Sequence, residues 1–88
     1  MDAGSIGIIT RVSGPVVDIQ FPGHGDVPDI FHAVEVSVGG DIHVLECLQQ
    51  LGGGAVRCIS MRPTDGMSRG MQARDTGAPI SEIGRAHV

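Results

Sequence analysis

The chain has 88 residues, 41 % of them hydrophobic, and a net charge of −4, which fits one small domain. All six basic residues are arginine. The absence of lysine excludes a Schiff-base lysine and the phosphate-binding lysine of a Walker A loop. An acidic balance with scattered arginines also argues against a nucleic-acid-binding surface, which requires clustered positive charge.

The same totals predict a protein of the cytoplasm. Two cysteines are too few for a disulfide scaffold, which favours a reducing compartment. The first five residues carry no basic residue, so we expect no signal peptide. No stretch approaches the ~20 apolar residues of a membrane span, so we expect no membrane insertion.

Residues 6–21 predict two antiparallel strands joined by a tight turn. Placing a two-residue turn at Ser13–Gly14 gathers apolar residues on one face, because strand side chains alternate with a period of two. The pairs expected in this register are Thr10 with Val17, Ile8 with Ile19, and Ile6 with Phe21. Arg11, Asp18 and Gln20 then lie on the other face.

Further short strands follow at regular spacing. Residues 22–29 predict a loop, residues 31–38 a strand with Val34, Val36 and Val38 on one face, and Gly39–Asp41 a turn. Residues 42–51 and 55–61 predict two more strands around Gly52–Gly54. Residues 63–80 are rich in turn-forming residues, with only short extended pieces expected. No window has a sustained helical period, so helix is limited to about one turn. The pattern predicts a small antiparallel barrel or sandwich, and a closed barrel is favoured because it leaves no exposed strand edge.

The histidines and cysteines do not show the spacing of a metal site. Structural zinc sites draw on close ligand pairs, and no such pair occurs here. The residues tested are His24, His32, His43, His87, Cys47 and Cys58. We expect no bound metal.

The two cysteines allow two registers of the hairpin around Gly52–Gly54. A two-residue loop at Gly52–Gly53 sets Cys47 opposite Cys58, whereas a three-residue loop pairs Cys47 with Ile59. The second register gathers more apolar residues on one face and is preferred. It predicts two unlinked thiols that pack as small hydrophobic side chains.

No arrangement of residues predicts catalysis. Gly66, Ser68 and Gly70 have the G-x-S-x-G spacing of a nucleophile elbow, but that motif opens a helix after a strand, and no helix is predicted here. Asp65 and Asp75 stand in turn sequences, where Asp commonly bonds its own backbone. A single D-T-G does not make a carboxylate dyad, and the glycine-rich stretches lead into strands rather than helices. The arginines Arg57, Arg62, Arg69, Arg74 and Arg85 are interpreted either as a solvated rim or as partners for ion pairs with another subunit.

Three stretches resemble the N-terminal domain of the β subunit of F-type ATP synthases. They are "VSGPVVD" at 12–18, "LECLQQLG" at 45–52, and "VRCISMRPTDGMSRGMQARDTGAPI" at 56–80. The likeness runs from about Gly7 to Arg85. Arg74 and Ser68 depart from it, because an aliphatic residue and a valine or alanine are usual there.

The resemblance implies a six-stranded barrel over residues 1–80. Residues 81–88 are expected to begin a linker to a nucleotide-binding domain absent from this chain, and residues 63–80 to lead toward it. In that family, barrels of alternating α and β subunits form a ring that holds the catalytic head together. The implied partners are therefore α-subunit barrels. The chain itself is expected to hold no cofactor, while the full-length subunit binds Mg-ATP or Mg-ADP in a head peripheral to the membrane. Coupling to H⁺ or Na⁺ stays open.

An oligonucleotide- or protein-binding barrel of the OB type is the alternative. That class stacks bases on exposed aromatic side chains beside a basic groove. Phe21 and Phe31 are the only aromatic residues of the chain, and its net charge is negative. Both features make the alternative weaker than the assembly domain.

Overall fold

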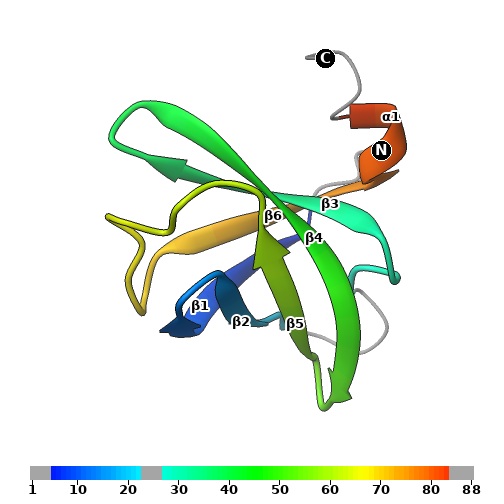
Figure 1. Cartoon of the computed structure of the whole chain (residues 1–88). Helices are drawn as coiled ribbons and strands as arrows, with labels where there is room; N and C mark the ends of the chain where they lie inside the picture. The colour runs from blue at the N-terminus through cyan, green and yellow to red at the C-terminus, as the bar shows by residue number, and fades with distance from the viewer. Residues whose placement is uncertain (1–4, 23–26, 84–88) are drawn as a thin grey trace.

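A closed barrel accounts for almost all of the structure, which is a computed structural model that describes residues 5–22 and 27–83. Its six strands are β1 (Ile6–Ser13), β2 (Val16–Gln20), β3 (His32–Val38), β4 (Asp41–Gly52), β5 (Ala55–Ser60) and β6 (Gln72–Pro79). They close in the order β1-β2-β5-β4-β3-β6, and every neighbouring pair is antiparallel (Figure 1). The predicted small closed six-stranded antiparallel barrel is confirmed.

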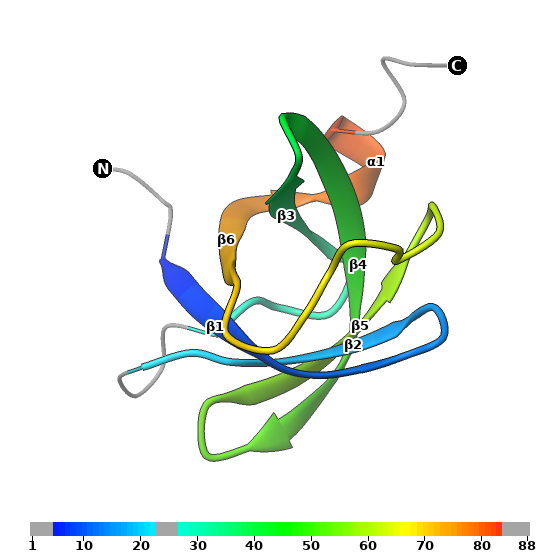
Figure 2. The ribbon, with the colours of Figure 1, turned by 90° about the vertical axis from the view of Figure 1, so that its left-hand side faces the viewer.

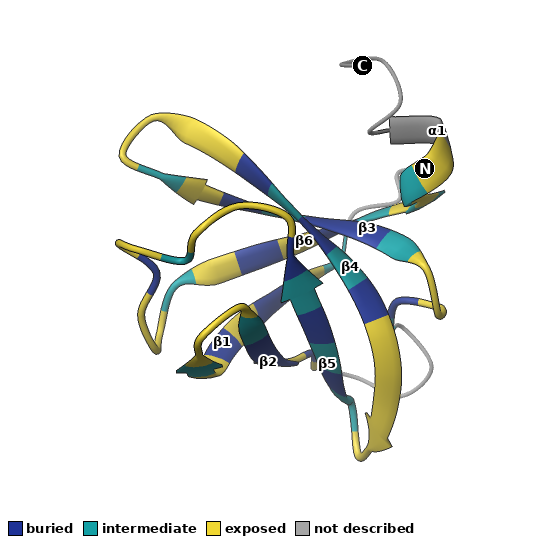
Figure 3. Ribbon diagram, in the orientation of Figure 1, coloured by how far each residue is buried: buried dark blue, intermediate teal, exposed yellow. Residues whose placement is uncertain are grey.

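The core is filled by the inward-facing residues of all six strands. Figure 3 shows buried and partly buried residues alternating along β5, as expected when one face of a strand is buried. Phe21 is the largest fully buried side chain. The cluster around it consists of Ile9, Val17, Ile19, Val34, Val36, Leu45, Cys47, Val56, Cys58, Met67 and Ala73. Val34 and Val36 face inward as the sequence predicted.

The first hairpin turns one residue later than predicted. Gly14 and Pro15 form the turn, and Gly14 has φ +59°, which suits the first central position of a type II′ turn. Ser13 pairs with Val16 and Ile9 with Ile19, while Thr10 is an extra residue where the register shifts. The predicted pairing of Ile8 with Ile19 is therefore wrong. The bulge at Thr10 turns Ile9 into the core and leaves Ile6 and Ile8 on the outer surface.

The β4–β5 hairpin also differs from its predicted register. Gly53 and Gly54 make the turn, and Gly52 pairs with Ala55. The register shifts twice along β4, once between Gln50 and Gly52 and once between Cys47 and Gln49. These shifts bring Cys47 directly opposite Cys58, so the preferred pairing of Cys47 with Ile59 is wrong. Both cysteines are nevertheless free and buried, as expected.

The end of the chain contributes a full strand that the turn-rich sequence did not predict. β6 closes the barrel by pairing with both β1 and β3, and Arg74 lies between Ile6 and Glu35. The stretch 63–80 is therefore part of the barrel as well as its exit. Beyond it, α1 (Ile80–Ile83) is a single helical turn. The backbone N–H of Ile80 donates to the carbonyl of Phe31 at 2.9 Å, which places α1 beside the start of β3 (Figure 1).

The two hairpins point to opposite sides of the barrel. In Figure 2 the tip of β1–β2 lies on the right and the tip of β4–β5 on the lower left. Gly39 and Gly40, both with positive φ, form the predicted turn between β3 and β4. The barrel therefore presents its outer strand faces, and no free strand edge, to a partner.

Candidate assembly interface

Large apolar side chains are exposed over much of the outer surface. An exposed leucine or isoleucine is ordinary when alone, whereas a group of them marks an interaction surface. In the described residues the exposed large hydrophobic side chains are Ile6, Ile8, Ile30, Phe31, Ile42, Leu48, Leu51 and Met61. Six of them form two groups, and Ile8 and Met61 belong to neither.

The first group, which we call the β4-end patch, consists of Ile30, Phe31, Leu48 and Leu51. The segment before β3 runs along the end of β4, because Gln50 Nε2 donates to the carbonyl of Pro28 at 2.9 Å. The N–H of Phe31 donates to the carbonyl of Cys47 at 2.7 Å. Figure 3 shows the last part of β4 exposed, in yellow.

Both leucines of the β4-end patch stand at the register shifts of β4. Leu48 lies between Cys47 and Gln49, and Leu51 between Gln50 and Gly52, so each is an extra residue opposite β5. A bulge interrupts the alternation of a strand and redirects a side chain. The two bulges thus leave two leucines on the outer surface of one strand end, a placement that regular alternation does not give.

Phe31 is held in a costly conformation for a non-glycine residue. Its φ is +73°, and in the described part of the chain no other non-glycine residue has a positive φ. Hydrogen bonds on both sides fix its backbone, from its N–H to Cys47 and from Ile80 to its carbonyl. The left-handed region costs an L-residue about 1–2 kcal/mol. Its side chain is nevertheless 58 % exposed, so the barrel core does not compensate for this strain.

The second group, the β1–β3 face, lies around an ion pair between β6 and β3. Arg74 of β6 contacts Glu35 of β3, with Nη2 and Oε1 2.6 Å apart. The apolar side chains of Ile6 and Ile42 flank it. Together they line a shallow hollow of about 220 Å³ with Ser37, Gln72 and Ala73.

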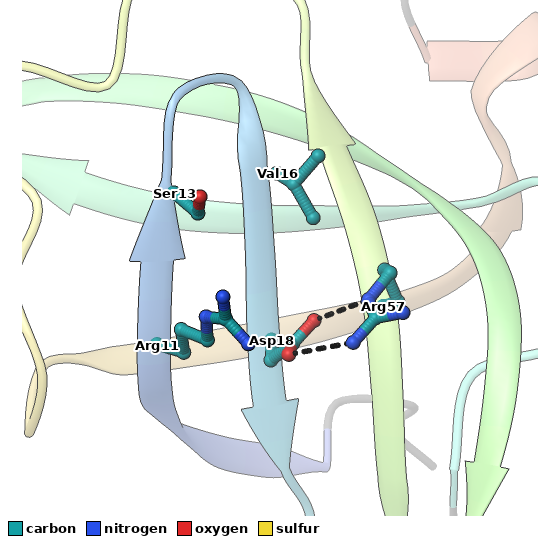
Figure 4. Close-up of a pocket in the computed structure, with 5 residues that line it drawn as sticks. All are labelled: Arg11, Ser13, Val16, Asp18 and Arg57. Carbon is teal, nitrogen blue, oxygen red and sulfur yellow. Dashed lines mark hydrogen bonds and ion pairs between the residues drawn. The ribbon is translucent and has the colours of Figure 1, made fainter.

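A third feature is a polar hollow on β1, β2 and β5 (Figure 4). Asp18 accepts two hydrogen bonds from Arg57, at 2.9 Å from Nε and 3.1 Å from Nη2. This carboxylate raises the pKa of Arg57, through the hydrogen bond first and its charge second. Arg11 pairs with Asp18 in the β1–β2 register, and its side chain points toward it. The hollow, of about 290 Å³, therefore carries two guanidinium groups and one carboxylate.

Three of the arginines form ion pairs within the chain. Arg57 pairs with Asp18, Arg74 with Glu35, and Arg62 lies 4.0 Å from Asp41. The Arg62–Asp41 pair is exposed on both sides and contributes little to stability. Cross-strand pairing of opposite charges is the signal that could have located the first two. Arg85 lies outside the described residues.

The candidate chemical residues do not converge on one site. Asp75 accepts from the N–H of Gly77 at 2.9 Å, so the prediction that it bonds its own turn is confirmed. Its Oδ1 also lies 3.1 Å from His32 Nδ1. Among the described residues no three His, Cys, Asp or Glu side chains gather as metal ligands would. His24 and His87 lie outside those residues.

Two buried features were not expected from the sequence: the direct pairing of Cys47 with Cys58, and the burial of the polar residue His43. Cys47 and Cys58 face each other on the neighbouring strands β4 and β5, and the Cys47 thiol donates to the carbonyl of Pro28 at 3.8 Å. The proximity of the two thiols lowers the pKa of Cys47 and raises that of Cys58. His43 is buried, and its Nδ1 has no hydrogen-bond partner among the described residues. Neither feature supplies a nucleophile with a base in reach.

Helix length and hydropathy bear on whether the chain could cross a membrane. Within residues 5–22 and 27–83, no helix reaches the length and apolar character of a membrane span.

A family comparison agrees with the barrel fold. Residues 9–77 match the ATP synthase alpha/beta family, beta-barrel domain. The match begins inside β1 and ends inside β6, so it includes every strand of the closed barrel. In this family the N-terminal barrel is a non-catalytic domain, which implies assembly in the hexameric α/β ring. The chain belongs to the ATP synthase alpha/beta family and contains its N-terminal β-barrel domain.

Proposed function

We propose that the chain is the barrel domain of a β subunit and that it holds alternating α and β subunits together. The motifs at 12–18, 45–52 and 56–80 favour β over α, because they are the stretches that resemble the β-subunit domain. In this proposal the partners are α-subunit barrels on either side. The parent enzyme synthesises or hydrolyses ATP and couples this to H⁺ or Na⁺ transport.

The observation that carries the proposal is the exposed apolar surface of a barrel without free edges. Partner strands cannot add to a closed barrel, so association must use side chains on its outer faces. The β4-end patch and the β1–β3 face offer two such surfaces. Two separate faces are what each member of a ring requires, because it contacts one neighbour on each side.

We place nucleotide chemistry outside this domain. The sequence carries no lysine for a phosphate loop, and no group of potential metal ligands gathers among the described residues. Mg-ATP and Mg-ADP are then ligands of the parent subunit, and the head that contains the barrel is a cytoplasmic assembly peripheral to the membrane. A titration of this chain with Mg-ATP is expected to give no saturable heat.

The experiment is a binding titration against the cognate α-subunit N-terminal barrel. Leu48→Glu places a charge in the β4-end patch and is expected to weaken binding at least tenfold, because desolvating an unpaired charge opposes association. Met61→Glu is the matched control, since Met61 is an exposed apolar residue outside both groups. Equal loss in both variants, with folding intact, contradicts the proposed surface.

The OB-type alternative has weaker support. Phe21 is buried in the core, so it offers no stacking surface, and Phe31 is then the one aromatic residue available to a base. Salt-dependent binding of a fluorescent single-stranded oligonucleotide would favour this alternative.

A further inference from the structure

Cys47 and Cys58 form a buried pair on neighbouring strands. They are Cα partners in the β4–β5 ladder, and both are fully buried. Both are reduced in the structure. The core role predicted for them needs only two small apolar side chains and does not require them to face each other.

The hydrogen-bonding pattern shows which kind of antiparallel pair they make. The carbonyl of Cys47 accepts from Phe31, on the β3 side of β4, and so points away from β5. The N–H of Ser60 donates to Pro15, on the β2 side of β5. Cys58 lies two residues before Ser60, so its backbone groups point the same way. Cys47 and Cys58 are therefore a non-hydrogen-bonded pair.

This geometry brings the two sulfur atoms within bonding reach. Cα atoms of a non-hydrogen-bonded pair are about 4.5 Å apart, and their side chains approach more closely than in hydrogen-bonded pairs. Disulfides require Cα atoms about 4.4–6.8 Å apart. The effect of each thiol on the pKa of the other, lowered for Cys47 and raised for Cys58, agrees with close contact.

We propose that Cys47 and Cys58 are a site of reversible oxidation, which hydrogen peroxide closes to a disulfide across β4 and β5. The sulfur of Cys47 attacks the peroxide, the O–O bond breaks, and a sulfenic acid and one water form. The sulfur of Cys58 then displaces the sulfenic hydroxyl as a second water, and the S–S bond forms. The two thiols lose two electrons and two protons, and the peroxide gains them.

The residues around the pair indicate which cysteine reacts first with peroxide and where the peroxide enters. We assign Cys47 as the attacking sulfur because it adjoins the break in the ladder between Cys47 and Gln49, whereas Cys58 lies within regular pairing on its β2 side. The neighbouring thiol lowers the pKa of Cys47 and raises that of Cys58, which agrees with this order. The Leu48 bulge adjoins Cys47 and interrupts the ladder there. Both cysteines are fully buried, so oxidation requires local opening of the strand pair at this point to admit a molecule as small as peroxide. A reducing cytosol reverses the reaction.

The test uses the whole chain at a pH where it is folded. After peroxide treatment the protein is denatured, alkylated and digested with trypsin, which cuts after Arg57, between the two cysteines. We expect loss of both alkylated thiols, one linked pair of peptides containing Cys47 and Cys58, and a melting temperature raised by several degrees. Dithiothreitol should restore both thiols.

Single variants test the assigned order. Cys58→Ser should leave a Cys47 sulfenic acid that dimedone traps, whereas Cys47→Ser should show much slower oxidation of Cys58. In the wild-type protein, retention of both thiols overturns the proposal. Oxidation that yields only intermolecular dimers or sulfinic acid, with no linked peptides, overturns it as well. The wild-type result decides the matter even if either variant fails to fold.

Discussion

His43 is a polar residue inside an apolar barrel. It faces inward from β4, beside the core residue Leu45, and its Nδ1 is buried without a partner among the described residues. A desolvated and unbonded polar atom destabilises a fold by about 1–3 kcal/mol. His43 therefore carries a cost that an apolar residue of similar size avoids.

Replacing His43 with leucine is expected to stabilise the barrel. His43→Leu removes the unpaired nitrogen and keeps the side-chain volume nearly constant, so unfolding should require about 1 kcal/mol more free energy. Urea denaturation followed by circular dichroism measures this change. A clear loss of stability in His43→Leu would show that the ring nitrogen makes a favourable contact in solution.

Phe31 offers a second prediction at the residue scale. Phe31→Gly relieves the strain of the positive φ and removes a side chain that is mostly exposed. The isolated barrel should therefore keep its stability to within about 1 kcal/mol, because the relief of strain is offset by the greater freedom of glycine in the unfolded chain.

Binding to the α-subunit barrel should respond differently. Phe31→Gly should weaken that binding if the phenyl ring belongs to the interface, and calorimetric titration against the α-subunit barrel measures this effect. Phe31→Asn is the control for conformation, because asparagine also tolerates the left-handed region. Unchanged affinity in both variants would exclude Phe31 from the interface.

The β4–β5 hairpin is the element where backbone geometry leaves least choice of residue. Gly54 has φ +87°, and a Cβ there would lie 2.5 Å from the carbonyl oxygen of Phe21. The same glycine accepts the backbone hydrogen bond of Phe21. Its neighbour Gly53 also has a positive φ, but a Cβ there meets nothing within 4 Å.

The two glycines of this turn form a matched pair for mutation. Gly53→Ala should cost about 1 kcal/mol, because only the backbone conformation is strained. Gly54→Ala should cost roughly 2–4 kcal/mol, since the methyl group also displaces the Phe21 backbone. Thermal unfolding of the two variants in parallel measures the difference. Equal losses would mean that β2 and the hairpin tip do not meet as closely as the structure places them.

For β1 to β5 the sequence could predict which segments are strands, but not the register in which they pair. Alternation in residues 31–38 identified β3 and its buried valines correctly, because one face of that strand is apolar throughout. The bulges at Thr10, Leu48 and Leu51 each add one residue to a strand and reverse its alternation. Nothing local marks them, since their positions depend on closure of the whole barrel.

β6 was not predicted as a full strand, for a related reason. Its sequence, QARDTGAP, has glycine, proline and two charged residues, which are poor strand formers. It forms a strand because β1 and β3 supply hydrogen-bonding partners on both sides. Tertiary pairing here outweighs local propensity. The same closure creates the outer surface of β1, β6 and β3, so the candidate interface could not be derived from local patterns either.

At the scale of the whole molecule, the barrel has a stable interior and an incompletely covered exterior. A closed ladder protects the strand edges from unspecific pairing. The β4-end patch and the β1–β3 face are then the features that call for a partner. In the proposed ring, α-subunit barrels cover them. The chain alone should stay a monomer at low concentration, because neither patch is a continuation of the strand ladder.

The most direct test is the solution mass of this chain by light scattering, alone and mixed with the cognate α-subunit N-terminal barrel. We expect a monomer that gains mass only in the mixture, with the gain lost in Leu48→Glu and kept in Met61→Glu. A chain that forms a closed oligomer by itself and ignores the α-subunit barrel would contradict the assignment as an assembly domain of the α/β ring.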